Sequence, residues 1–315
     1  MRVVVTGACG TIGSALVAQL LTREQEVVAY DNLLYNGHPP LLDLAIDPRL
    51  TFVRGDVRDR RALAKTVEGA DAVVHLAAIV GAPACRRDPE LSAAVNVGGT
   101  ANVVAALREK APQAHLIFAS TDSCYGVGAP GRVCSEQTPL RPLTEYGRDK
   151  ESAERLVMGA PKWTIARFAT AFGLSRRLRL DLIVNDFTWQ AVHNRHLIVY
   201  ESGYARTFLH VLDIVAAIEL MLGRPEEAVG QVYNVGDDRL NITKADVAKT
   251  VATVVQGTSL NLLGEGSDPD QRNYVVEHTA IRQLGFEAAI TLEQGVRELA
   301  KGFSMLDVRS PFKNA

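Results

Sequence analysis

The chain has 315 residues, of which 47% are hydrophobic and 22% charged, and its formal net charge is −2 at pH 7. This composition is typical of a globular protein and gives no electrostatic basis for binding nucleic acid or an anionic membrane. No apolar run approaches the roughly 18 residues that a membrane span requires. The four cysteines (Cys9, Cys85, Cys124 and Cys134) lack the spacing of metal ligands, so we expect no metal site and a reduced, cytoplasmic environment.

A glycine-rich turn follows the first apolar run of the chain, residues 3–6. Gly7, Gly10 and Gly13 come at three-residue spacing, and an apolar-periodic helix is expected over 14–22. Glycines at this spacing permit a tight turn, a close approach of backbone N–H groups to a pyrophosphate, and close packing of helix against strand. The start of the helix adds partial positive charge. The segment therefore predicts a dinucleotide site.

An acidic residue, Asp31, ends the second apolar run, residues 27–30. A carboxylate at this place accepts hydrogen bonds from the adenosine ribose hydroxyls and repels a 2′-phosphate. We therefore expect NAD, rather than NADP, as the cofactor.

Strand-like and helical segments alternate through the first half of the chain. The expected strands are 3–6, 27–30, 50–54, 72–76, 115–120 and 163–168, and the expected helices are 14–22, 60–68, 91–110 and 147–158. This alternation predicts an α/β fold, a Rossmann-type doubly wound parallel sheet with a smaller, discontinuous C-terminal substrate domain. We expect the NAD-binding domain over 1–172 and about 205–258. The substrate domain is then expected over about 173–204 and 259–315.

Tyr146 and Lys150 are four residues apart, so they share one face of the expected helix. A lysine ammonium beside a phenol favours the phenolate and lowers the pKa of the tyrosine. Tyr146 is therefore a candidate general base or acid, and Lys150 can also hold the nicotinamide ribose.

Hydroxyl groups follow the strand that ends near Ser120. Thr121 offers a hydroxyl that can orient a substrate oxygen and relay its proton. Asp122 and Ser123 are candidates for contact with the same substrate. Capping of the turn is the alternative for both, because Ser and Asp favour such turns.

The chain resembles the extended short-chain dehydrogenase/reductases, and within them the nucleotide-sugar epimerase/dehydratase group. The segments that carry the resemblance are 6–13, 31–33, 55–57, 75–78, 96–100, 120–126, 146–150, 206–213 and 270–286. It implies that bound NAD oxidises a sugar hydroxyl, usually at C4, while Tyr146 removes the hydroxyl proton and Thr121 assists. The keto-sugar is then altered, and the hydride usually returns. The resemblance also implies a homodimer; the apolar face within 96–107 is a candidate for its contact, and core packing explains that face equally well.

The resemblance also assigns binding residues. Cofactor contacts are expected at Gly7, Gly10, Thr11, Ile12, Gly13, Asp31, Asn32, Asp56, Val57, Leu76, Ala77, Ala78, Asn96, Tyr146 and Lys150. In this set Asp56 and Val57 match the adenine-contacting pair, and Asn96 matches the position that orders the active-site helix. Contacts to the diphosphate of a nucleotide-sugar substrate are expected at Asn185, Arg206 and Arg272, with ion pairing as the alternative for the two arginines.

Two departures from the family pattern bear on the reaction. The dTDP-glucose 4,6-dehydratases carry Asp-Glu after the threonine, whereas this chain has Asp122-Ser123 and lacks the glutamate base. Thr170 stands where the family usually has Asn. We therefore predict an NAD-dependent nucleotide-sugar epimerase. A dehydratase or a keto-sugar reductase is the alternative among enzymes, and an NAD-binding regulator is the alternative outside them.

Overall fold

The computed structural model describes residues 1–35, 40–127, 133–264 and 273–306. Its centre is a seven-stranded parallel sheet with the strand order β11-β7-β5-β4-β1-β2-β3. The strands are β1 (Arg2–Thr6), β2 (Glu26–Asp31), β3 (Leu50–Arg54), β4 (Ala72–His75), β5 (His115–Thr121), β7 (Trp163–Phe168) and β11 (Gln231–Val235). The strand order reverses between β1 and β4, and ligands of such sheets bind at this point, beyond the carboxyl ends of the strands.

Successive side chains of each central strand enter opposite hydrophobic layers. In β1, Val3 and Val5 belong to one buried cluster and Val4 to the other, as the two-residue period of a strand requires. Burial on both faces explains why these strands are nearly continuous apolar runs.

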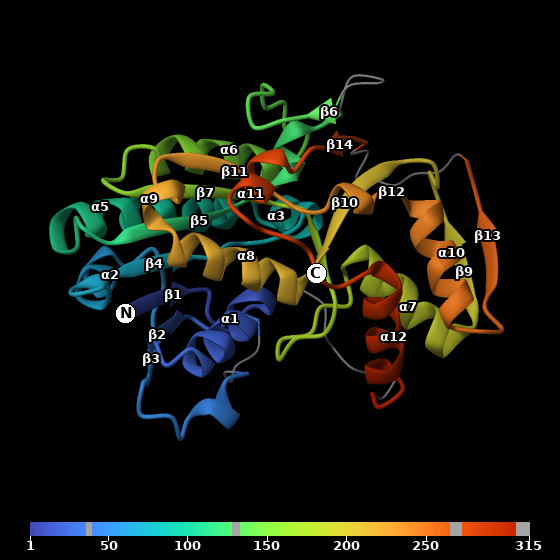
Figure 1. Cartoon of the computed structure of the whole chain (residues 1–315), viewed down its shortest axis with the longest axis horizontal. Coiled ribbons are helices and arrows are strands. Elements are labelled where there is room, and N and C mark those ends of the chain that lie inside the picture. The colour runs from blue at the N-terminus through green and yellow to red at the C-terminus, as the bar shows by residue number, and fades with distance from the viewer. Residues whose placement is uncertain (36–39, 128–132, 265–272, 307–315) are drawn as a thin grey trace.

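Helices cover both faces of the sheet (Figure 1). On the Val3 side lie α1 (Thr11–Thr22), α8 (Val211–Gly223) and α11 (Thr279–Gln283). On the Val4 side lie α2 (Arg60–Val67), α5 (Thr100–Lys110) and α6 (Glu145–Val157). The apolar side chains of α5, among them Val103 and Leu107, pack in this second cluster, so core packing accounts for the apolar face within 96–107.

Residues 91–110 are helical throughout, as predicted, but a π-helical turn interrupts the α-helical pitch. Short helices α3 (Ala82–Arg87) and α4 (Pro89–Ala93) are followed by a π-helical turn, Ala94–Gly99, and then by α5. A Cβ atom on Gly99 would lie 2.5 Å from Cγ2 of Val57. The glycine therefore allows a close approach of the turn to the loop after β3, which an unbroken sequence pattern does not reveal.

A smaller part packs beside the sheet around α7 (Ile183–Asn194), α10 (Lys244–Val254) and α12 (Leu292–Phe303), which Figure 1 shows together at one end of the molecule. Its strands are β8 (Thr170–Phe172), β9 (His196–Val199), β10 (Ala205–His210), β12 (Asn241–Thr243) and β13 (Ser259–Leu262); β6 (Val133–Cys134) pairs with β14 (Val275–Val276), and α9 (Pro225–Ala228) precedes β11. The predicted domain limits stay a prediction. One difference is that α10 packs with α7 and α12 through Val247 and Val251, although we expected 205–258 in the NAD-binding domain.

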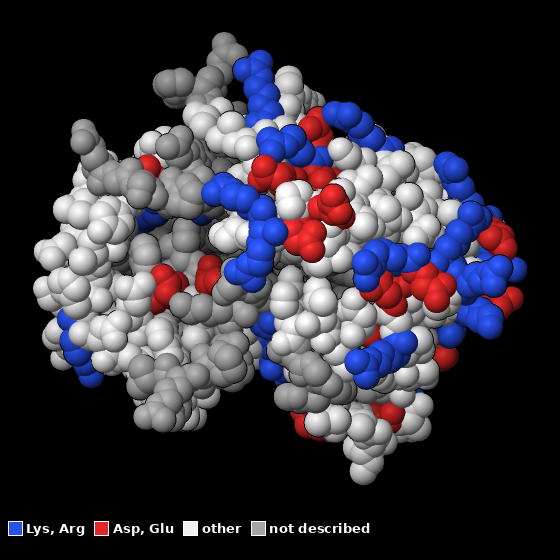
Figure 2. All heavy atoms as spheres, turned by 180° about the vertical axis from the view of Figure 1, so that it is seen from behind, with Lys and Arg blue, Asp and Glu red and all other residues white. Residues whose placement is uncertain are grey.

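The predicted fold class is confirmed. The distribution of charged side chains on the surface agrees with the small net charge of the chain. On the face that Figure 2 shows, basic and acidic side chains are interspersed. Within the described ranges, no helix is long and apolar enough to cross a membrane.

The approach of α1 to the turn after β1 gives a stability prediction. A Cβ atom on Gly13 would lie 2.2 Å from the carbonyl oxygen of Gly7 and 2.8 Å from Cα of Ala8. Gly13→Ala should therefore lower the free energy of unfolding by about 1–3 kcal/mol or more, the range found for overpacking, as measured by urea denaturation. Gly223→Ala is the matched control, because its Cβ would meet no atom within 4 Å. Equal stabilities of the two variants would contradict the prediction.

Candidate active site

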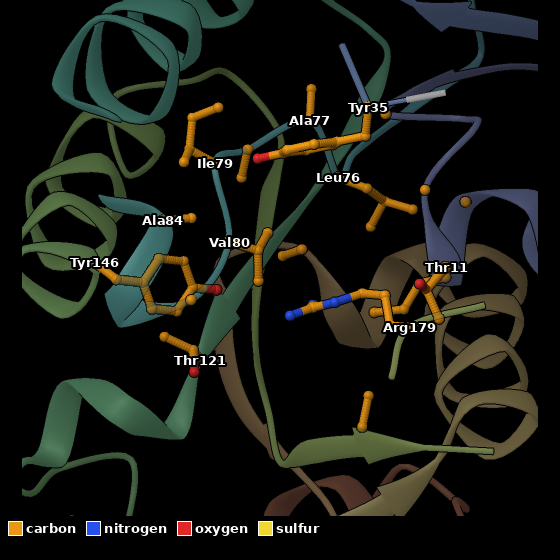
Figure 3. A pocket seen from close by; sticks show the side chains of 18 of the residues that line it. Thr11, Tyr35, Leu76, Ala77, Ile79, Val80, Ala84, Thr121, Tyr146 and Arg179 are labelled. Carbon is orange, nitrogen blue, oxygen red and sulfur yellow. The ribbon is translucent and has the colours of Figure 1, made fainter. Parts of the chain in front are cut away.

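A cavity of about 770 Å³ lies at the carboxyl ends of the central strands. One wall comes from the loops after β1, β2, β4 and β5, and another comes from the chain after β7, residues 168–183. Figure 3 shows side chains of both walls, with Tyr146 and Thr121 near one end and Tyr35 on the opposite side.

The glycine turn forms one end of the cavity. Gly7 has φ of +70°, and a Cβ atom there would lie 2.6 Å from the backbone nitrogen of Ala77. Gly10 precedes α1 and provides no side-chain cap, so the first N–H groups of the helix, at Thr11, Ile12 and Gly13, are available to a ligand in the cavity that these residues line. We call this glycine turn and helix start the cradle. Side chains in place of the glycines would fill the cradle, and its free N–H groups suit a pyrophosphate.

The carboxylate of Asp31 lies beside this turn. It accepts hydrogen bonds from the backbone N–H of Cys9 (2.9 Å) and of Leu33 (2.8 Å). Burial raises the pKa of Asp31, and the two N–H groups and the charge of Arg177 partly oppose the rise. Asn32 also lines the cavity. Asp31 therefore lies beside the glycine turn in the cavity, where the sequence predicts that it contacts the adenosine ribose of NAD.

Asp56 lies behind Asn32 instead of lining the cavity, which Val57 does. Its carboxylate accepts a hydrogen bond from Nδ2 of Asn32 (3.0 Å) and pairs with Arg58 (2.7 Å). The Arg58 guanidinium holds the pKa of Asp56 well below its usual range. The side chain of Asp56 therefore positions Asn32, and its predicted adenine contact stays a prediction.

The loop after β4 supplies Leu76, Ala77 and Ala78 to the cavity. Asn96 lies behind this loop. Its side-chain amide donates to the carbonyl of Ile79 (3.1 Å) and accepts from the N–H of Ile79 (2.8 Å).

Asn96 is also connected to α6. Its amide donates to Oγ of Ser92 (3.1 Å), and that hydroxyl donates to the carboxylate of Asp149 (2.5 Å). Asn96 thus fixes the Ile79 loop relative to the helix that carries Tyr146 and Lys150. This geometry is consistent with the ordering role that the family resemblance implies.

Helix α6 begins at Glu145, so Tyr146 and Lys150 lie one turn apart on it, and both line the cavity. Thr144 caps the helix by accepting from the N–H of Gly147 (3.2 Å). Nζ of Lys150 donates to the carbonyl of Ala119 (2.7 Å), and burial lowers the pKa of Lys150 to about 8. The structure therefore brings an ammonium group and a phenol to the same end of the cavity.

Thr121 and Ser123 follow β5 and also line the cavity. Oγ1 of Thr121 donates to Oγ of Ser123 (3.0 Å) and accepts from the N–H of Ser123 (3.1 Å). Figure 3 shows Thr121 next to Tyr146.

Asp122 differs from the expectation of substrate contact. It is 1% exposed and is not one of the residues lining the cavity. It lies toward Tyr125 and Cys134, and its charge adds to the effect of burial in raising the pKa of both groups. The reason is the tight turn over Asp122–Tyr125, which turns neighbouring side chains in different directions. The cap of this turn is Thr121, which accepts from the N–H of Ser123, so the structure assigns capping to neither Asp122 nor Ser123. Ser123 lines the cavity, and the substrate contact of Asp122 stays a prediction.

On the second wall, Arg206 of β10 lines the cavity and is 3% exposed. Asn185 does not line the cavity, and its expected diphosphate contact stays a prediction. The side chain is fully buried, and its amide is engaged with the backbone N–H of Gly173 (3.0 Å) and the carbonyl of Arg179 (2.8 Å). Asn185 thus supports the wall from behind. Arg272 lies outside the described residues.

Two groups of residues were missed by the sequence analysis. Arg177 and Arg179 line the second wall; the alternation of arginine and leucine in their segment was the available signal. Glu154 continues the four-residue spacing of Tyr146 and Lys150, and it accepts from Oγ of Ser120 and pairs with buried Arg167 (2.7 Å). This pair ties α6 to β5 and β7.

No group of three His, Cys, Asp or Glu side chains within the described ranges is arranged to hold a metal ion. The four cysteines are buried free thiols.

The buried ammonium of Lys150 predicts a pH dependence of stability. Its pKa is lowered from 10.5 to about 8 by burial, so the folded chain binds this proton less tightly than the unfolded chain does. The contribution of Lys150 to the free energy of unfolding therefore rises with pH between about 8 and 10.5, by about 3 kcal/mol in total. Relative to Lys150→Met, which lacks this proton, the natural protein should gain that amount over the same window, as measured by urea unfolding of cofactor-free protein. Lys65→Met, at an exposed lysine of α2, controls for loss of a charge. A difference between natural protein and Lys150→Met that does not vary with pH would contradict the prediction.

The chain is similar to known proteins over most of its length. A family model described as the NAD dependent epimerase/dehydratase family matches residues 3–236. The chain is 32% identical over 270 residues to the Uncharacterized UDP-glucose epimerase YtcB of Bacillus subtilis, covering 81% of each chain. It is 31% identical to the dTDP-glucose 4,6-dehydratase of Streptomyces griseus, over 94% of this chain and 92% of that protein.

A solved structure shows the same architecture. The UDP-glucose 4-epimerase of Thermus thermophilus, crystallised as a complex with NAD, matches with a TM-score of 0.83 at 26% identity and covers 96% of this chain and 99% of the other. The resemblance inferred from the sequence and the assignment of NAD as cofactor are confirmed. The chain belongs to the NAD-dependent epimerase/dehydratase family.

Proposed function

We propose that this protein is an NAD-dependent nucleotide-sugar epimerase that works through transient oxidation of a sugar hydroxyl, at C4, to a keto-sugar. The observation that carries the proposal is that Tyr146, Lys150, Thr121 and Ser123 line the same cavity as the glycine turn. Gly7, Gly10–Gly13 and Asp31 would hold the adenosine and pyrophosphate of NAD. When bound, NAD supplies an acceptor for a hydride and can return it.

The side chains then have separate roles. Oη of Tyr146 removes the proton of the sugar hydroxyl and later returns a proton to the same oxygen. The Lys150 ammonium favours the phenolate, because an adjacent positive charge stabilises the anion. Since burial lowers the pKa of Lys150 to about 8, this support weakens as the pH rises through that value. The hydroxyls of Thr121 and Ser123 orient the substrate oxygen.

Two features favour an epimerase over a dehydratase. A dehydration expels a hydroxyl and needs an acid and a base beside the carbons that lose water. Ser123 is not a base, and Asp122 does not line the cavity. A dehydratase is the second candidate, because this chain is as similar to a dehydratase as to an epimerase.

We propose a nucleotide-diphosphate sugar as substrate, since Arg206 presents a buried positive charge to the cavity and a guanidinium fork suits phosphate oxygens. The contribution of Arg272, the homodimer and the cytoplasmic location stay predictions. An NAD-binding regulator, in contrast, has no use for an activated tyrosine.

Cofactor preference gives a first test. Asp31→Ala should weaken NAD binding, because it removes the acceptor for the ribose hydroxyls. It should also reduce the ratio of the affinity for NAD to that for NADP, because it removes the charge that repels a 2′-phosphate. Asp31→Asn keeps one acceptor oxygen and should mainly narrow the preference. Asp47→Ala, which removes an acid paired with Arg49 outside the cavity, is the control. Titration calorimetry with both cofactors measures these effects, and equal or tighter binding of NADP by the natural protein would refute the assignment.

The reaction itself is tested by mass spectrometry. Incubation with a panel of nucleotide-diphosphate hexoses should give a product isomeric with its substrate, with no need for added NADH. Tyr146→Phe keeps the ring and should lower turnover by at least about 10²–10⁴-fold, whereas Tyr200→Phe, at an exposed tyrosine away from the cavity lining, should not. A product that has lost one water, formed by the natural protein and not by Asp122→Asn, would establish the dehydratase instead.

A further inference from the structure

Residues 175–181, here called the strap, cross from the smaller part of the molecule to the glycine turn. Arg177, Arg179 and Asp181 line the cavity, whereas Leu178 and Leu180 between them are buried in the smaller core. Alternate side chains of this segment thus face opposite sides, although its backbone bends at residues 176–177 and 180–182. The pattern Arg-Leu-Arg-Leu-Asp therefore directs charges into the cavity and leucines into the core.

The strap is tied to the Rossmann part at the glycine turn itself. Oγ1 of Thr11, the first residue of α1, donates to the carbonyl of Arg177 (2.8 Å), which also accepts from Oγ of Ser175 (2.7 Å). Further out, Arg176 pairs with Asp43 (2.9 Å). Figure 3 shows Thr11 and Arg179 together on one side of the cavity. The strap therefore lies against the cradle where the pyrophosphate is expected.

The guanidinium of Arg177 lies at the cavity wall near Tyr35 and Asp31. It lies 5.6 Å from the centre of the Tyr35 ring, and its backbone carbonyl is held at Thr11. Its charge is close enough to lower the pKa of Asp31. Arg177 is 6% exposed, and one of its nitrogens donates to the carbonyl of Leu178 (2.8 Å). A guanidinium carries five N–H donors in a planar fork, a geometry that suits the oxygens of a phosphate.

We propose that Arg177 binds the pyrophosphate of NAD, and that the strap, tied at Thr11 beside the glycine turn, retains the cofactor. NAD then leaves only when the Thr11 contact opens. The inference rests on NAD binding and is independent of which sugar is converted. It goes beyond the proposed reaction by assigning cofactor retention to a segment outside the Rossmann sheet.

The direct test is the rate at which NAD dissociates. Protein loaded with fluorescent etheno-NAD is mixed with excess NAD in a stopped-flow instrument. Arg177→Ala should accelerate dissociation by about tenfold to a hundredfold, the range for loss of a charged hydrogen bond. Thr11→Val removes the tie with little change of volume and should raise both association and dissociation rates, by about two- to tenfold.

Matched variants separate retention from general damage. Arg176→Ala removes only the exposed ion pair with Asp43 and should leave the dissociation rate within about twofold of that of the natural protein. Arg177→Lys keeps the charge and should restore part of the retention. If Arg177→Ala does not fold, Thr11→Val and Arg177→Lys decide the question. If NAD dissociates from Arg177→Ala and Thr11→Val, or from Thr11→Val and Arg177→Lys, at the rate of the natural protein, the proposal is overturned.

Truncated ligands identify the group that Arg177 contacts. In calorimetry, Arg177→Ala should weaken the binding of ADP-ribose and ADP and leave that of adenosine unchanged. An equal loss for all three would show that Arg177 only shapes the site and would refute the pyrophosphate contact. None of these measurements uses a sugar substrate, so a failure of the epimerase assay and a failure of the strap are distinguishable.

Discussion

The close approach of helix α1 to the turn after β1 is the constraint on which the site depends. The carbonyl of Gly7 occupies the space that a side chain on residue 13 would need, and Gly7 itself lies against the backbone of Ala77. These contacts bring the first N–H groups of α1 to the point where the strand order reverses between β1 and β4. A pyrophosphate can be bound there by backbone alone. The same packing places Thr11 at the cavity, where the strap meets it.

The catalytic end depends on how α6 is held. Tyr146, Lys150 and Glu154 follow one another at four-residue spacing. Tyr146 lines the cavity, and Lys150 donates to the carbonyl of Ala119. Glu154 accepts from Ser120 and pairs with Arg167. Desolvation makes a buried ion pair weak evidence for stability. We therefore assign the Glu154–Arg167 pair a positioning role, since it fixes α6 against two neighbouring strands. The same burial lowers the pKa of Lys150 to about 8, which connects the packing of the helix to its acid–base chemistry.

The cavity itself is shared between the two parts of the molecule. The Rossmann part provides the glycine turn, Asp31 and Tyr146. The smaller part provides Arg177 and Arg179 from the chain after β7, and Arg206 from β10. A reaction that takes a hydride and returns it requires that the cofactor stay while the sugar changes its orientation. A wall that contacts the cofactor from the smaller part meets this requirement better than an open Rossmann cleft does.

Features that depend on short spacings can be predicted from the sequence. The glycine turn, the acid at the end of β2, the parallel sheet and the shared helix face of Tyr146 and Lys150 lie in segments of a few residues, because strand and helix periods decide where neighbouring side chains point. The family resemblance extended these to Asn96 and Arg206, which the structure places in the site or directly behind it.

Which side of a turn or wall a residue faces depends instead on how distant segments pack together. Asp122 lies outside the cavity lining, although Thr121 and Ser123 on either side of it line the cavity. Asn185 is hydrogen-bonded to the backbone of Gly173 and Arg179. The strap contacts a helix start far away in the chain, and Glu154 meets an arginine on another strand. Such contacts depend on how whole layers pack together, and no local period in the sequence encodes that packing.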